Sequence, residues 1–176
     1  MACCIIIYIL VLIGFIKTFF TRLLFSSFKS SKLDHIIDNI YLGNWRDSIN
    51  EEKLKANGIK CILTLNKEYR HDEKDMDIFD KLSIQQKYIE IYDSTSSVIS
   101  PYLEESVEFI KKCNGNVLVH CTAGVSRSAS VVIYYLIKEK NMTYSDALYY
   151  VRNKRPIVNP NRSFVQQLKE LEGKIS

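Results

Sequence analysis

The segment from Asn116 to Glu139 constrains the fold more than any other part of the sequence. It opens with NVLVHC, a β-branched apolar run that ends at Cys121 and is typical of a buried strand. A short loop that contains Gly124 follows, and an almost wholly apolar helical pattern then begins at Arg127. A strand, a loop and a helix N-terminus in this order predict a layered α/β domain with a phosphate-binding concavity, because the loop and first helical N–H groups point into one space.

Two side chains of this segment carry reactive chemistry. A thiol at a helix N-terminus beside a fixed cation has a lowered pKa, so we expect Cys121 to be a thiolate that attacks phosphorus. The guanidinium of Arg127 can fold back and hold two phosphate oxygens at once, which a Lys cannot do as well. Gly124 suits a loop position that requires positive φ or close backbone approach. A loop that only binds phosphate needs neither the thiol nor the guanidinium, so the pattern indicates nucleophilic catalysis.

The stretch HCTAGVSRS, from His120 to Ser128, resembles the signature loop of the protein tyrosine phosphatase superfamily at each of its His, Cys, Gly, Arg and Ser positions. The sequence from Ile36 to Glu172 is similar to the dual-specificity branch, in its atypical form with a single catalytic domain. This resemblance implies a phosphoprotein phosphatase that acts on phosphotyrosine and on phosphoserine or phosphothreonine. It also implies a cysteinyl-phosphate intermediate and no cofactor or metal.

The same resemblance assigns roles to further residues. It makes Asp93, which follows the run YIEIY, the general acid, and Asn159 a brace for the phosphate loop. Ser128 would stabilise the departing sulfur, and His120 would orient the loop and tune the thiol. The implied substrate-binding positions are Thr122, Ala123, Gly124, Val125, Ser126 and Arg127. From the residues alone, Asp93 and Asn159 are also typical turn residues, and that alternative stays open.

Strand and helix patterns alternate around this segment. Further strands are predicted at Ile40–Asn44, Cys61–Asn66 and Tyr88–Tyr92. Helices are predicted at Glu51–Ala56, Ser100–Cys113, Thr143–Val151 and about 162–171. The alternation predicts a central, mostly parallel twisted sheet of about five strands flanked by helices, within one catalytic domain over residues 33–176. We expect this domain to be a monomer.

An uncharged apolar run from Ala2 to Ile16 precedes the domain. As a helix it would reach about 24 Å, which is less than the roughly 30 Å of a hydrocarbon core, so a full span is marginal. No cation precedes the run and no clear cleavage site follows it, which favours a membrane anchor over residues 1–25 rather than a signal peptide. Residues 26–32 are predicted to be a linker. The cations that follow the run would keep the catalytic domain in the cytosol; they are Lys17, Arg22, Lys29 and Lys32.

The five cysteines show neither regular spacing nor a CxxC pair. They therefore predict no disulfide framework and no zinc site, and they favour a reducing compartment. Cys61 and Cys113 are interpreted as small buried hydrophobic residues. Cys3 and Cys4 are candidates for palmitoylation or for burial in a membrane.

The charged residues are nearly balanced, with 24 Lys and Arg against 20 Asp and Glu, which gives little support to nucleic-acid binding. Arg152, Lys154 and Arg155 are interpreted as the solvated end of a helix. His35 and His71 are expected to be exposed, without a partner at metal-ligand spacing.

Two other functions stay open. Relatives with this loop also act on inositol lipids or on the 5′ end of RNA, and an anchored domain would reach a lipid headgroup. Against a polyanionic substrate, the variable loop positions contain no Lys. The other possibility is a module that binds phosphoproteins without turnover. Such modules usually lose the cysteine, the arginine or the acid, whereas this chain has all three.

Overall fold

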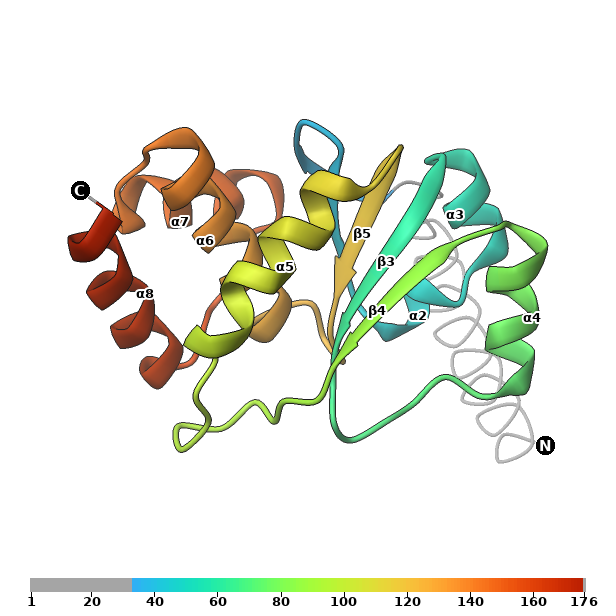
Figure 1. Ribbon diagram of the computed structural model, residues 1–176, viewed down its shortest axis with the longest axis horizontal. Helices are drawn as coiled ribbons and strands as arrows, with labels where there is room; N and C mark the ends of the chain where they lie inside the picture. Colours follow the sequence, from blue (N-terminus) through green and yellow to red (C-terminus); the bar gives the residue numbers. More distant parts are fainter. Residues whose placement is uncertain (1–32, 176) are drawn as a thin grey trace, which may run out of the picture. The chain divides into compact units, whose positions relative to one another are not determined.

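The sheet at the centre of the fold has five strands in the order β1-β2-β5-β3-β4 (Figure 1). The computed structural model describes residues 33–175. The strands are β1 (Asp34–Ile37), β2 (Ile40–Gly43), β3 (Ile59–Leu65), β4 (Gln85–Ile89) and β5 (Asn116–His120). β1 and β2 are antiparallel, and all the other neighbouring pairs are parallel. The prediction of a mostly parallel α/β sheet of about five strands is confirmed, and the antiparallel edge strand β1 is an addition to it.

Seven helices are described within residues 33–175. They are α2 (Trp45–Ser48), α3 (Glu51–Ala56), α4 (Glu73–Lys81), α5 (Ser100–Lys112), α6 (Arg127–Lys140), α7 (Tyr144–Lys154) and α8 (Arg162–Ile175). The predicted helices are all present, with ends that shift by a few residues. α2 and α4 were not predicted, because α2 is four residues long and α4 fully buries only Phe79.

The helices cover both faces of the sheet. Figure 1 shows α5 to α8 gathered on one side of it and α3 and α4 on the other. Alternation along the strands divides the core accordingly, because successive side chains point to opposite faces. Leu63 belongs to the larger cluster with α5 to α8, whereas Ile62 packs with Leu54 of α3 and Phe79 of α4. The sheet is therefore buried on both faces, and its carboxyl edge is left for the loops.

Cys61 of β3 and Cys113 at the end of α5 form a disulfide, with their Cα atoms 6.1 Å apart. Both residues are buried, as predicted, but the prediction of free thiols is wrong. The two cysteines are 52 positions apart, and only the packing of α5 against β3 brings them together, so their spacing carried no signal. Because this disulfide is present, the cysteines no longer argue for a reducing compartment.

The predicted anchor (1–25) and linker (26–32), with Cys3 and Cys4, lie outside the described residues. Within residues 33–175, every helix is too short or too polar to cross a membrane.

Candidate active site

The loop between β5 and α6 holds Cys121 at the carboxyl edge of the sheet. Cys121 is 1% exposed, and its sulfur accepts hydrogen bonds from the Gly124 amide at 3.2 Å and from Ser128 Oγ at 3.3 Å. Burial alone would raise the pKa of this thiol. The hydrogen bonds from Ser128 and the positive charge of Arg127 outweigh burial and lower the pKa of Cys121 below its usual value. The site therefore favours a thiolate.

Gly124 allows the loop to lie directly against the end of β2. Its φ is +67°, and a Cβ atom here would lie 2.3 Å from the Gly43 carbonyl oxygen. An L-residue side chain at this position would meet both a strained backbone and a steric clash. Gly124 is therefore required by the path of the loop, as its position in the sequence suggested.

Arg155 supports the outer side of the same loop. It is buried, and its Nε donates to the Gly124 carbonyl at 2.8 Å while Nη2 donates to the Ala123 carbonyl at 3.2 Å. Its Nη1 pairs with Asp34 of β1 at 2.5 Å. The prediction that Arg155 belongs to a solvated helix end is wrong, because the chain turns at the end of α7 and directs this one cation back into the domain.

The guanidinium of Arg127, at the start of α6, is 3% exposed and points back beneath the loop. Nη1 donates to Glu68 Oε2 at 2.6 Å and to the Ile91 carbonyl at 3.0 Å, and Nη2 donates to Thr122 Oγ1 at 3.0 Å. Its Nε is buried and makes no hydrogen bond with any residue between 33 and 175. The head group is thus held in one orientation, and its Nε–H is not used in a hydrogen bond within the described residues.

Asn66 and Glu68 are site residues that sequence reasoning missed. Asn66 is fully buried at the end of β3, and its Oδ1 accepts from Thr122 Oγ1 at 3.3 Å and from the Glu68 amide at 3.1 Å. Burial opposes ionisation of Glu68, but the hydrogen bond from Arg127 prevails and lowers the pKa of the carboxyl group. One signal could have found them: Asn66 ends the predicted strand Cys61–Asn66 and Glu68 follows it, at the sheet edge where the Cys121 loop also lies.

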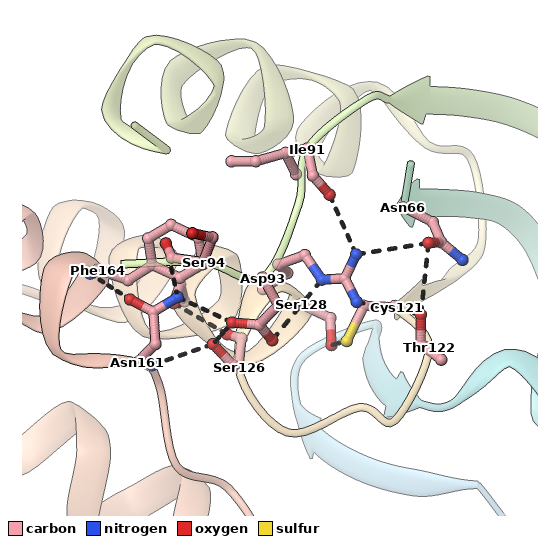
Figure 2. A network of polar contacts seen from close by, with 12 residues as sticks. Asn66, Ile91, Asp93, Ser94, Cys121, Thr122, Ser126, Ser128, Asn161 and Phe164 are labelled. Atoms are coloured by element: carbon pink, nitrogen blue, oxygen red, sulfur yellow. Dashed lines mark hydrogen bonds and ion pairs between the residues drawn. The ribbon is translucent and has the colours of Figure 1, made fainter. Parts of the chain in front are cut away.

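Asp93 lies on the segment that follows β4, facing the same loop (Figure 2). Its Oδ1 accepts hydrogen bonds of 2.8 Å from Ser126 Oγ and 2.8 Å from Asn161 Nδ2. Its Oδ2 lies 3.7 Å from Arg127 Nε. The side chain is 30% exposed, so the carboxylate is both oriented by the loop and open to solvent. The residue predicted as the acid is thus placed beside the predicted nucleophile loop.

Asn161 joins the loop to Asp93 and to α8. Besides the bond from its side chain to Asp93, its backbone amide donates to Ser126 Oγ at 3.0 Å, and its side-chain Oδ1 accepts from the Phe164 amide of α8 (Figure 2). Asn159 does contact the loop, but through its own amide, which donates to the Val125 carbonyl at 2.9 Å. The Asn159 side chain accepts from Arg152 instead. Asn159 and Asn161 therefore both contact the phosphate loop through their backbone amides.

His120 lies fully buried beneath the loop. One ring nitrogen is 2.8 Å from Thr64 Oγ1, and the other is 3.4 Å from the Cys121 carbonyl oxygen. Burial, with smaller contributions from His71 and Arg127, lowers the pKa of His120 to about 3. A neutral, fully enclosed imidazole at this place positions the Cys121 backbone and is poorly suited to accept a proton from substrate.

His71 departs from its predicted exposure. Its ring stacks on Trp45, with centroids 4.2 Å apart, and one nitrogen lies 3.2 Å from Ser48 Oγ. Burial lowers the pKa of His71. His35 is exposed, as predicted. Within the described residues, no cluster of three His, Cys, Asp or Glu side chains could hold a metal ion.

Comparison with known proteins agrees with this geometry. The family described as "Dual specificity phosphatase, catalytic domain" matches residues 40–174. Dual specificity protein phosphatase 1 of Arabidopsis thaliana is 35% identical over 140 residues, which cover 78% of this chain and 67% of that protein. Dual specificity protein phosphatase 16 of Homo sapiens is 38% identical over 146 residues, which cover 80% of this chain and only 21% of the human protein.

Solved structures show the same relationship. The crystal structure of DUSP15 has a TM-score of 0.73 and 29% sequence identity, covering 81% of this chain and 88% of that chain. The human tyrosine phosphatase-like serine/threonine/tyrosine-interacting protein has a TM-score of 0.69 at 28% identity, covering 82% of this chain and 98% of that one. With a family match over most of its length and the Cys121 loop at its centre, the chain belongs to the dual specificity phosphatase family.

Proposed function

We propose that this chain is a cysteine-dependent protein phosphatase that hydrolyses phosphotyrosine and phosphoserine or phosphothreonine in protein substrates. One observation carries the proposal: Asp93 is hydrogen-bonded to Ser126, within the loop whose first residue is Cys121 and whose end leads into Arg127. A nucleophile, a cation and an acid therefore face one small space. No cofactor or metal is needed for the reaction that these groups support.

In the first step, the Cys121 thiolate attacks phosphorus, and an S–P bond forms as the P–O bond to the substrate side chain breaks. The loop amides and Arg127 bind the phosphoryl oxygens, and the Nε–H of Arg127, which makes no hydrogen bond within the described residues, supplies one donor for the charge that develops there. Asp93, protonated at the start of this step, gives its proton to the departing oxygen. Glu68 and Asn66 keep the guanidinium oriented throughout.

In the second step, water attacks the phosphorus of the cysteinyl phosphate. Asp93 accepts a proton from that water, the S–P bond breaks, and inorganic phosphate leaves with the sulfur again a thiolate. Ser128 Oγ, which already donates to the sulfur, stabilises the thiolate as leaving group. The enzyme returns to its starting state without any external reductant or cofactor.

The test is phosphate release by the full chain from three substrates in parallel. They are a phosphotyrosine peptide, a doubly phosphorylated peptide and a phosphoinositide dispersed in detergent. We expect turnover of both peptides and little of the lipid, because positions 122–126 of the loop contain no Lys or Arg. Faster turnover of the phosphoinositide would assign the site to lipids. Binding of phosphopeptides without any phosphate release would assign it to a binding module.

We also propose that residues 1–25 anchor the protein in a membrane, with the catalytic domain in the cytosol. The support is the uncharged run from Ala2 to Ile16, followed by four cations. Cell fractionation tests this: the full chain should sediment with membranes and resist carbonate extraction, and external protease should not reach the domain in intact cells. Recovery of the full chain in the soluble fraction would contradict the anchor. Secretion with the N-terminus removed would show a signal peptide instead.

A further inference from the structure

A cavity opens beside the phosphate loop. It has a volume of about 500 Å³ and is lined by Asn44, Trp45, Arg46, Tyr69, Thr122 and Ala123. Thr122 and Ala123 directly follow Cys121, so the cavity adjoins the place where the scissile phosphate binds. None of the catalytic roles proposed above uses Trp45, Arg46 or Tyr69. The cavity, called here the flanking pocket, therefore calls for a separate explanation.

The position of the Trp45 ring in this pocket is well defined. The Trp45 amide donates to the Thr122 carbonyl at 3.2 Å, which joins the start of α2 to the loop. One face of the indole stacks on His71, and the ring of Tyr69 lies 6.2 Å away at an angle of 47°. Tyr69 is 58% exposed, whereas its carbonyl oxygen accepts a hydrogen bond from Tyr88. Both aromatic rings line the flanking pocket.

Arg46 is the charged residue of the flanking pocket. It is exposed, and no hydrogen bond or ion pair joins it to any residue between 33 and 175. Three other arginines of the described residues are engaged in ion pairs. Arg127 pairs with Glu68, Arg155 with Asp34, and Arg70 with Glu90. Within residues 33–175, the positive charge of Arg46 thus has no counter-charge next to the loop, and the lining of the cavity contains no carboxylate.

We propose that the flanking pocket binds a second anionic group of the substrate, with Arg46 as its counter-ion. The group is a phosphate or a carboxylate on a residue close to the phosphorylated one. Charge complementarity identifies this occupant. A cationic substrate residue would be repelled by the Arg46 guanidinium, and an uncharged residue would give it no counter-charge. The inference rests on the proposed phosphatase function and adds to it a preference for acidic or doubly phosphorylated sequences.

Trp45 is the only tryptophan of the chain and therefore reports on the pocket directly. The experiment titrates full-length Cys121→Ser with three phosphotyrosine peptides that differ at one neighbouring residue, which is alanine, glutamate or phosphothreonine. The set is made twice, with that residue before or after the phosphotyrosine. We expect an anionic neighbour to change Trp45 fluorescence more and to tighten binding by about fivefold, the gain of one favourable exposed charge pair. The gain should shrink as salt is raised.

Two further variants isolate the contribution of Arg46. Arg46→Gln in the same background should bring the anionic peptides to the affinity of the alanine peptide. Lys60→Gln is the matched control, since it removes one exposed positive charge at the opposite end of the sheet. Lys60 lies next to Ile59, which pairs with Asn116 at the start of β5. The phosphate loop follows the other end of β5. This control should keep the full preference.

The outcomes separate the pocket from the function on which it rests. A gain for both anionic peptides shows that a carboxylate suffices, and a gain for the phosphothreonine peptide alone identifies a second phosphate. Equal binding of all three peptides, or a preference that survives Arg46→Gln, overturns the pocket. Phosphate release by the unmutated chain is measured on the same peptides. Its absence would reject the phosphatase, while the titration would still decide whether Arg46 binds an anion.

Discussion

Asn161 Nδ2 donates a 2.8 Å hydrogen bond to Asp93 Oδ1, the same oxygen that accepts from Ser126. Asn161 also accepts from the first turn of α8, so it fixes the carboxylate relative to both a helix and the loop. We expect Asn161→Ala to lower kcat by about tenfold on alkyl phosphates and less on aryl phosphates with good leaving groups, because a displaced acid matters most where the leaving oxygen needs a proton. An equal loss on both classes would show that Asn161 only supports the fold.

We expect substitution of the acid, Asp93, to produce a larger difference between alkyl and aryl phosphates. Asp93→Asn keeps the shape of the side chain but removes the proton, so hydrolysis of alkyl phosphates should slow by about a hundredfold or more. Good phenolic leaving groups should lose much less. Rates measured over a series of leaving groups with different pKa values check this. A uniform loss would redirect the search for the acid to Asp72, Asp75 or Asp77, on the segment before β4.

Cys121→Ser and Arg127→Lys should each reduce kcat by at least about a hundredfold. The serine hydroxyl is a far weaker nucleophile, and a lysine cannot reproduce the fork that contacts both Glu68 and Thr122. Steady-state phosphate release is the measurement, with circular dichroism to show that both variants are folded. Activity within about tenfold of the parent in either variant would remove the mechanism proposed here.

Ser128 lowers the pKa of Cys121 by donating to its sulfur, so its removal should shift the pH dependence of the thiolate. The charged form is the one that gains this bond. Ser128→Ala should therefore raise the pKa of Cys121, and the rate of alkylation by iodoacetamide should reach half its plateau at a higher pH than in the parent. Alkylation does not depend on turnover, which separates this effect from slower breakdown of the intermediate. An unchanged profile would contradict the assigned role.

The disulfide between Cys61 and Cys113 should stabilise the domain without taking part in catalysis. Closing a loop of 52 residues removes conformational entropy from the unfolded chain that corresponds to about 4 kcal/mol. We expect the double variant Cys61→Ser and Cys113→Ser to unfold at a lower denaturant concentration, by a difference of that order, and to retain its activity when folded. Denaturant titration without reductant measures this. Equal stability, with no cross-linked peptide found by mass spectrometry, would show that the pair is not oxidised in solution.

The part of the site that could be predicted is the part that is contiguous in sequence. The loop from His120 to Ser128 carries its nucleophile, its cation and the required glycine within a few residues, and the strand before it and the helix after it have clear periodicities. Strand β4 was predicted three residues too late, because its first half is the polar QQK of an exposed edge while the apolar alternation continues to Ile91.

The supporting residues could not be predicted in the same way. Asn66, Arg155 and Asn161 contact the loop from other parts of the chain, at sequence separations that carry no local pattern. Asn161 lies two residues after Asn159, and both contact the loop through their backbone amides, but only the Asn161 side chain reaches Asp93. The Cys61–Cys113 pair has the same origin: its partners are neighbours only once α5 packs on β3.

The salt bridge from Asp34 to Arg155 sets the N-terminal limit of a functional fragment. The family match begins at residue 40, yet the carboxylate that pairs with Arg155 belongs to β1, ahead of that point. A truncation at residue 40 would retain every residue of the phosphate loop and still remove the counter-charge of the arginine that holds the Ala123 and Gly124 carbonyls. We therefore expect the minimal catalytic fragment to be longer than the stretch by which the family is detected and to include Asp34.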